Sequence, residues 1–277
     1  MSAKLSFHAI TVFPEMVSRA LGYGVVAQAV KAGLIDFKVT NPRTFTSNVH
    51  QTIDDRPFGG GDGMLMLAEP LASAVESVRA AIPPEAKVRA VHLSPRGNKL
   101  TDQRVREFAR EYTDIILVAS RYAGVDQRFL NTFIDEEISI GDFVVSGGEL
   151  PLLVLIDAVS RHVPGVLGND ASSEDESFAS SLGGGLEFPQ FTRPREWREH
   201  AVPHELISGD HANVGKWKRA LGVLVTAEHR PDLLSGLSPE ELRLAEKVLK
   251  QMSDVELIEC GLHDRERLLA RLRNCFT

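Results

Sequence analysis

The first 165 residues alternate between short strand-type segments and amphipathic helix-type segments. Strand-type segments, rich in β-branched, aromatic or buried aliphatic residues, lie at 5–13, 34–40, 88–93, 115–119 and 138–145. Segments with helical spacing or capping signals lie at 15–33, 68–82, 101–112 and 152–161. Because alternating strands and helices need crossover connections, this part is predicted to be an α/β domain with a largely parallel sheet and helices on both sides.

The composition changes beyond residue 165. Residues 166–190 are rich in Gly, Ser and acidic residues and contain few large apolar side chains, so they are predicted to be a flexible interdomain linker. Residues 191–277 carry helix signals only, including a capping box at Ser238–Glu241. We therefore predict an α/β domain at 1–165, a linker at 166–190 and a small all-α domain at 191–277.

Composition narrows the class of protein. The 277 residues are 43% hydrophobic and 25% charged, as in ordinary soluble proteins, and no apolar run approaches the ~18 residues of a membrane span, so no membrane partner is expected. The two cysteines, Cys260 and Cys275, are too few for a disulfide scaffold, and a cytoplasmic location is expected. The net charge of −7 is concentrated in 166–190, so it does not decide about a nucleic-acid partner.

Three short motifs partly match known binding motifs, for a dinucleotide, for zinc and for a phosphate, but each lacks a feature that the known motif requires. The Gly22–Ala27 segment matches a dinucleotide fingerprint, but it does not directly follow a strand. His200 and His204 have the spacing of a zinc pair, but no third ligand is evident. Gly59–Gly63 lacks the Lys-Ser/Thr of a phosphate-binding loop, which leaves two alternatives, a flexible loop or a surface that a nucleic acid approaches closely.

Three glycine-containing loops follow or lie within predicted strands, at Leu93–Gly97, Ser120–Gly124 and Ile140–Pro151. In open α/β sheets, ligands bind beyond the carboxyl ends of the strands. Either these loops converge on one small molecule, or their glycines only form turns. The residues alone leave both alternatives open.

Several blocks closely resemble the bacterial tRNA (guanine-N1)-methyltransferases and occur in the same order. They are Asp54–Gly61, Leu93–Pro95, Arg121–Gly124, Asp135–Glu137, Ile140–Pro151, Ser160-Arg161, Pro164–Gly168 and Thr192–Pro194. The Ile140–Pro151 block is long and highly specific. The resemblance runs from the first strand to about Trp217, and more loosely to the end of the chain.

The resemblance implies a knotted methyltransferase, with a deep trefoil knot in the α/β domain, that works as a homodimer with its active sites at the interface. It implies S-adenosylmethionine as methyl donor and 1-methylguanosine at position 37 of a tRNA, 3′ of the anticodon, as product. The family is associated with Mg²⁺, for which the sequence shows no ligand cluster. The cofactor contacts carry over onto Leu93, Ser94, Pro95, Ser120, Tyr122, Gly124, Ile140, Gly141, Asp142, Phe143, Val144, Val145, Gly147, Gly148 and Pro151.

The chemistry of guanine defines the catalytic roles that the resemblance assigns. Guanine N1 carries a proton, so a general base must remove it, and a cation near O6 stabilises the charge that develops there. The O6 role falls on Arg161. The family has Asp immediately before a Ser-Phe pair, where this chain has Glu176, so Glu176 is the expected base and Asp175 the alternative.

The resemblance also assigns the tRNA contacts. These are Asp54, Arg56, Gly59 and Gly60 in the α/β domain, and Arg193 and Lys216 in the helical domain. Trp197 and Trp217 would offer stacking surfaces.

Two rival functions remain. One is an α/β enzyme that uses a nicotinamide cofactor, which would need the Gly22 loop directly after a strand. The other is a catalytically inert RNA-binding protein with a degenerate methyltransferase fold. It is favoured by three departures from the family pattern, which usually has Gly at Ser120, Glu at Ala123 and Asp at Glu176.

Overall fold

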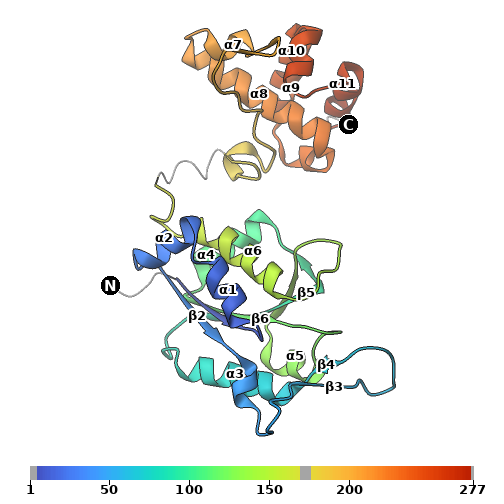
Figure 1. Ribbon diagram of the computed structural model, residues 1–277. Coiled ribbons are helices and arrows are strands. Elements are labelled where there is room, and N and C mark those ends of the chain that lie inside the picture. The colour runs from blue at the N-terminus through green and yellow to red at the C-terminus, as the bar shows by residue number, and fades with distance from the viewer. Residues whose placement is uncertain (1–4, 169–175, 276–277) are drawn as a thin grey trace. The chain divides into compact units, whose positions relative to one another are not determined.

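The computed structural model describes residues 5–168 and 176–275, and the chain forms two compact units, Met1–Gly168 and Asn169–Thr277 (Figure 1). Asp175 lies outside the described residues, as does the rest of 169–175. Among the described helices, none is both long and apolar enough to cross a membrane.

The first unit is built on one five-stranded sheet in the order β2-β1-β6-β5-β7. Its strands are β1 (Leu5–Ile10), β2 (Ile35–Thr40), β5 (Val88–Lys99), β6 (Asp114–Ala119) and β7 (Glu136–Ser139). Every neighbouring pair is parallel, which confirms the predicted α/β class. The central β6 is buried at each residue, as its continuous apolar run requires when helices cover both faces.

Helices cover both faces of this sheet (Figure 1). One face carries α1 (Pro14–Ala20), α2 (Gly24–Lys31), α4 (Asp102–Glu111) and α6 (Glu149–Ser160). The opposite face carries α3 (Ala68–Ala80) and α5 (Gln127–Phe133), and the chain also forms η1 (Pro42–Phe45) and the short pair β3 (Asp54–Asp55) and β4 (Leu65–Met66). Since α1 stands between β1 and the Gly22 segment, a dinucleotide-binding turn is absent there.

The strand predicted at 138–145 is wrong from residue 140 onward, because β7 spans Glu136–Ser139. The Ser139 hydroxyl accepts a hydrogen bond from the Gly141 amide (3.2 Å) and donates one to the Gly141 carbonyl (3.0 Å). Gly141 has a φ of 151°, outside the range of an ordinary strand residue. This local turn converts residues 140–148 into a loop that runs to the start of α6.

The second unit is built around a long helix, α8 (His211–His229), whose buried residues lie from Trp217 onward. The other elements are η3 (Ser180–Leu182), β8 (Glu196–Trp197), β9 (His200–Ala201), α7 (His204–Ile207), η4 (Pro231–Gly236), α9 (Pro239–Gln251), α10 (Asp254–Glu259) and α11 (Arg265–Asn274). Ser238 and Glu241 form the predicted capping box of α9. The sequence signals missed the small β8–β9 hairpin, since its strands have two residues each.

Thr226 of α8 attaches part of the segment 176–190 to the second unit. Its buried hydroxyl accepts a hydrogen bond from the Leu186 amide (2.8 Å) and donates one to the Gly222 carbonyl (2.7 Å). A Cβ on Gly222 would lie 2.9 Å from the Leu186 carbonyl oxygen, so glycine permits this close approach. The Ser177 hydroxyl in turn accepts from the Glu187 amide (3.2 Å). From Glu176 onward, this segment is therefore a structural part of the second unit.

Replacing Thr226 by valine, which has the same shape, should destabilise the second unit by about 0.5–1.5 kcal/mol, because the part-buried Leu186 amide would lose its acceptor. Chemical unfolding measures this loss, and hydrogen exchange at Leu186 should accelerate. Unchanged stability and unchanged exchange would show that the hydroxyl does not hold the segment.

Candidate functional site

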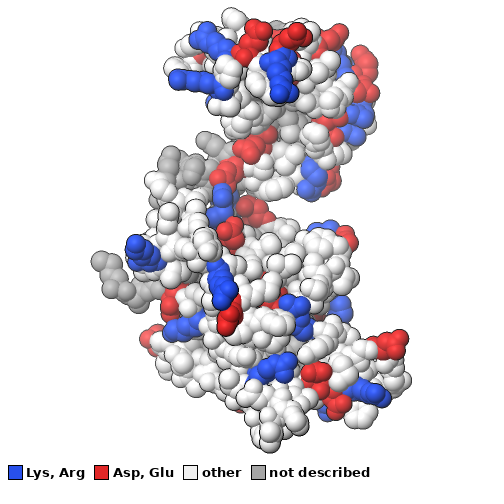
Figure 2. Space-filling model, in the orientation of Figure 1, with Lys and Arg blue, Asp and Glu red and all other residues white. Residues whose placement is uncertain are grey.

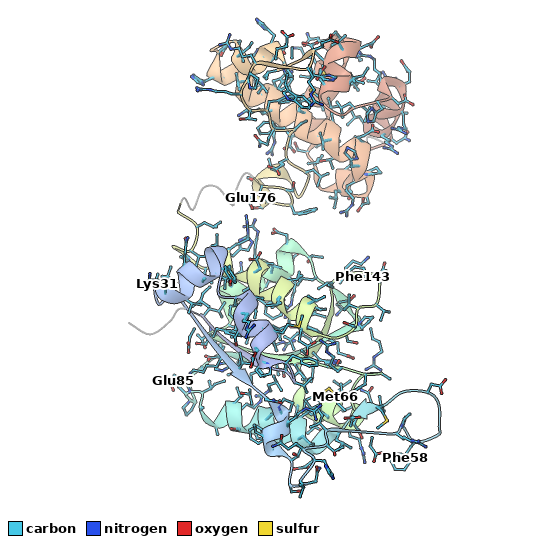
Figure 3. All side chains as sticks on the ribbon, in the orientation of Figure 1. Lys31, Phe58, Met66, Glu85, Phe143 and Glu176 are labelled. Carbon is cyan, nitrogen blue, oxygen red and sulfur yellow. The ribbon has the colours of Figure 1, made fainter. Side chains whose placement is uncertain are left out.

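A cavity of about 340 Å³ lies in the first unit where the three glycine-containing loops meet. The cofactor-contact residues predicted from the resemblance that line it are Leu93, Ser94, Pro95, Ser120, Tyr122, Gly124, Ile140, Gly141, Phe143, Val144, Val145, Gly147, Gly148 and Pro151. Asp142 does not line it, because its exposed carboxylate faces Lys99 at 3.0 Å. Arg96, Ala123 and Ser146 of the three predicted loops also line the cavity, and so do Ile138 and Ser139 of β7. Figure 3 shows Phe143 on the loop that follows β7.

Two glycines allow the loops to lie this close together. A Cβ on Gly148 would lie 2.7 Å from Ala119 Cα and 2.9 Å from the Ser120 nitrogen. A Cβ on Gly97 would lie 2.3 Å from the Glu137 carbonyl carbon, where β5 shifts its register against β7 between Leu93 and Asn98. Backbone therefore contacts backbone at both points, and no larger residue fits without movement.

Gly148→Ala should destabilise the first unit by about 1–3 kcal/mol, since the added methyl group overlaps main-chain atoms that cannot rotate away. The same displacement would deform the cavity wall at Ser120. Thermal unfolding measures the first effect, and Gly168→Ala is the matched control because a Cβ there meets nothing within 4 Å. Equal melting temperatures for the two variants would contradict the close approach.

A buried carboxylate fixes the loop before α6. The Glu149 side chain is fully buried, accepts a hydrogen bond from the Thr11 hydroxyl (2.8 Å), and lies 2.8 Å from the Arg121 Nε as an ion pair. Arg121 also donates to the Ser146 carbonyl (3.1 Å), and its guanidinium lies over the Phe13 ring. This network connects the loop after β6 to the loop after β7, which are two walls of the cavity.

Three hydrogen-bonded side chains, from β5, from β7 and from the loop after β6, lie next to the cavity. His92 Nδ1 is 2.9 Å from Glu137 Oε1, and His92 Nε2 is 2.9 Å from Ser120 Oγ. Burial lowers the pKa of His92, and the hydrogen bond with Glu137 opposes this shift without reversing it. Burial favours a higher pKa for Glu137, but the hydrogen bond from His92 and the charge of Arg96 lower it overall. Sequence reasoning missed His92 and Glu137, because only the pairing of β5, β6 and β7 brings them to Ser120.

The predicted tRNA contacts of the first unit lie on or beside a projecting loop. Asp54 belongs to β3, and Arg56, Gly59 and Gly60 follow it in the loop between β3 and β4, where Phe58 is fully exposed (Figure 3). The far end of this loop joins the cavity wall, since the Ala123 amide donates to the Met64 carbonyl (2.9 Å).

The proposed catalytic residues lie in different units. Arg161 is the C-cap of α6, with helical backbone angles, and Glu176 begins the described part of the second unit. Arg161 and Glu176 each interact with other residues of the protein. The cavity meets α6 at its opposite end, through Gly148 and Pro151.

The second unit has its own groove of about 580 Å³, which includes the basic residues Arg193, Arg195 and Lys218. Lys216 is exposed on α8 outside this groove. Trp197 is exposed, but Trp217 is only 6% exposed and packs in the core, so the prediction of a stacking surface at Trp217 is wrong. On the face seen in Figure 2, basic and acidic side chains are interspersed over this unit.

Within residues 5–168 and 176–275, no group of three His, Cys, Asp or Glu side chains is placed to hold a metal ion. His200 Nδ1 lies 2.8 Å from Glu259 Oε1. The described residues therefore assign no site for zinc or for the Mg²⁺ that the resemblance suggests.

Comparison with known proteins identifies the family. The tRNA (Guanine-1)-methyltransferase TrmD family matches residues 5–236. The tRNA (guanine-N(1)-)-methyltransferase of Pseudomonas putida W619 is 47% identical over 88% of this chain and 96% of its own length. The enzyme of the same name from Neisseria gonorrhoeae NCCP11945 is 46% identical over 90% of this chain and 98% of its own. The chain therefore belongs to the tRNA (guanine-N1)-methyltransferase family and is a tRNA methyltransferase.

Proposed function

We propose that the protein transfers a methyl group from S-adenosylmethionine, bound in the cavity of the first unit, to N1 of the guanosine at position 37 of a tRNA. The observation that carries this proposal is the convergence of three loops on one cavity in a chain of this family. Small-molecule sites typically have volumes of roughly 300–1,000 Å³, and this cavity falls within that range.

The residues present fit such a cofactor. The main chain borders the cavity at Gly124, Gly141 and Gly148, where no side chain separates the backbone from the ligand space. Leu93, Ile140 and Val145 provide apolar surface for a base, and Ser94 and Ser120 provide hydroxyls. When bound, S-adenosylmethionine supplies an electrophilic sulfonium methyl group.

Residues of the protein deprotonate the guanine and stabilise the negative charge that develops on it. Glu176 accepts the proton of N1, which makes the nitrogen a nucleophile, and Asp175 is the alternative base. Arg161 donates hydrogen bonds to O6 as negative charge moves onto it. Its guanidinium suits this role because it stays charged and presents a rigid pair of donors.

The geometry of α6 supports a homodimer with shared sites. The helix has 12 residues, so Arg161 lies about 18 Å from the end that borders the cavity. Leu150, Val154 and Arg161 have spacings of four and seven residues and so lie on one face, where Leu150 and Val154 are each 47% exposed. In a twofold, antiparallel pairing of this face, Arg161 of the partner subunit would reach the cavity.

The path of the chain supports a trefoil knot. After β7 the chain returns past β5, so that the Gly148 amide donates to the Ser120 carbonyl (2.8 Å) at the end of β6, a crossing that a trefoil knot requires.

Two surfaces would contact the tRNA. They are the glycine loop with Arg56 and the groove with Arg193, and their exposure and their basic residues support this role. A cytoplasmic location stays a prediction.

The test is transfer from labelled S-adenosylmethionine to a tRNA transcript with guanosine at position 37, compared with a transcript with adenosine there. Label should enter the first transcript only, at N1. Transfer to both transcripts, or to neither although S-adenosylmethionine binds, would contradict guanosine 37 as the acceptor. Repeating the assay with a chelator tests the Mg²⁺ requirement.

A further inference from the structure

The Ser120 hydroxyl is held in one orientation by a neighbour that lies outside the cavity. His92 is not among the cavity-lining residues, and its side chain is 3% exposed, whereas Ser120 lines the cavity directly. The two side chains meet at 2.9 Å through His92 Nε2 and Ser120 Oγ. The hydroxyl thus connects a buried imidazole to the ligand space.

The hydrogen-bond partners of Glu137, His92 and Ser120 determine where the protons lie. A carboxylate has only acceptors, so His92 must donate its Nδ1–H to Glu137. Glu137 is ionised, because Arg96 lies 3.4 Å from both its oxygens and Ser94 also hydrogen-bonds to it. A neutral imidazole carries one N–H, so Nε2 has a free lone pair. The hydroxyl of Ser120 therefore donates its proton to His92.

We propose that Ser120 is a specificity residue for the methyl donor, and that its oxygen acts in the cavity only as a hydrogen-bond acceptor. With its proton committed to His92, Oγ presents lone pairs to the ligand space and selects a ligand N–H or O–H group. His92 and Glu137 are positioning residues that fix this polarity. The inference rests on the proposed cofactor site.

Glu137, His92 and Ser120 follow one another in the order of a hydrolase triad, which is carboxylate, imidazole and hydroxyl. The groups around them do not allow triad chemistry. The imidazole of a triad must give its proton to a leaving group in the substrate space. His92 is buried behind the cavity wall and cannot reach such a group. The Arg121 amide, the next donor after Ser120, is directed at the Met66 sulfur (3.3 Å).

The test measures binding of S-adenosylhomocysteine by calorimetry, without turnover. Ser120→Ala should weaken binding about 3–10-fold, the loss of one hydrogen bond, and Ser73→Ala on the exposed face of α3 is the matched control. Equal affinities of wild type and Ser120→Ala overturn the inference. If the wild type does not bind S-adenosylhomocysteine, the proposed function itself fails, so the two failures are distinguishable.

Ligand analogues identify the donor group. Forms without the ribose hydroxyls, with a dimethylated base amino group, or without the α-amino group each remove one class of donor. For one of them, wild type and Ser120→Ala should bind equally, because the partner of Oγ is gone. If the difference persists for all three, the hydroxyl does not accept from the ligand and the inference is wrong.

The tautomer of His92 gives a readout that needs no His92 variant. Nitrogen NMR of the free protein should show a neutral ring protonated at Nδ1, and Ser120→Ala should shift the Nε2 resonance. A ring protonated at Nε2 would reverse the polarity of the Ser120 hydroxyl and overturn the inference, as would labelling of Ser120 by a fluorophosphonate.

Discussion

Arg161→Ala should lower the turnover of guanine methylation by about 10²–10³-fold, the usual effect of removing one donor to a developing oxyanion. Binding of S-adenosylhomocysteine should stay unchanged, because Arg161 lies at the end of α6 remote from the cavity of its own chain. Single-turnover methyl transfer and calorimetry measure the two quantities. Arg161→Lys should recover little of the rate, since an ammonium group lacks the paired donors of the guanidinium.

Mixing the Arg161→Ala variant with the Gly148→Ala variant, whose cavity is deformed, tests whether Arg161 serves the partner subunit. An Arg161→Ala chain keeps an intact cavity, and a Gly148→Ala chain keeps its arginine. If the site is shared, each mixed dimer has one complete site, so refolding equal amounts together should restore about a quarter of wild-type activity. If a single chain forms the site, no combination is complete and the mixture stays inactive.

Glu176→Gln should lower turnover by about two orders of magnitude or more, because glutamine keeps the shape of glutamate but cannot accept the N1 proton. Affinity for S-adenosylhomocysteine should not change, since Glu176 belongs to the second unit and the cavity to the first. Single-turnover rates measured with saturating tRNA isolate the chemical step from binding.

Asp175→Asn is the matched comparison for Glu176, because it removes the neighbouring carboxylate in the same way. We expect it to retain most of the wild-type rate. Full activity of Glu176→Gln combined with loss of activity in Asp175→Asn would transfer the role of base to Asp175.

The sheet was predictable because its strands are short apolar runs between amphipathic helices. Residues 115–119 had to be a central strand, since only a strand covered on both faces buries such a run. The same reasoning failed at 140–145, where Phe143, Val144 and Val145 look like strand residues but line a cavity. Their apolar character serves a ligand space rather than a packed core, and periodicity does not distinguish the two. It also missed α5, whose seven residues show too little periodicity.

The site was predictable where it depends on contiguous residues and unpredictable where it depends on pairing. The Ile140–Pro151 block carries Gly141, Gly147, Gly148 and the start of α6, so its resemblance to the family located one wall of the cavity. By sequence His92 is an ordinary strand residue, and Glu137 belongs to the Asp135–Glu137 block, to whose residues the resemblance assigns no role. They meet only because Leu93 aligns with Ala119 on β6 and Ile138 on β7, a register that no local signal encodes.

The hydrogen bonds of Thr226 have a consequence for the order of events in catalysis. They join the stretch that begins at Glu176 to the same body that carries the basic groove, whereas the donor pocket belongs to the other body. The proposed proton acceptor thus belongs to the unit that carries the proposed tRNA-binding groove. In the proposed mechanism, an enzyme that has bound only the methyl donor would not yet have its base at the reaction site. Binding of the tRNA would bring the base and the nucleophile to the donor together.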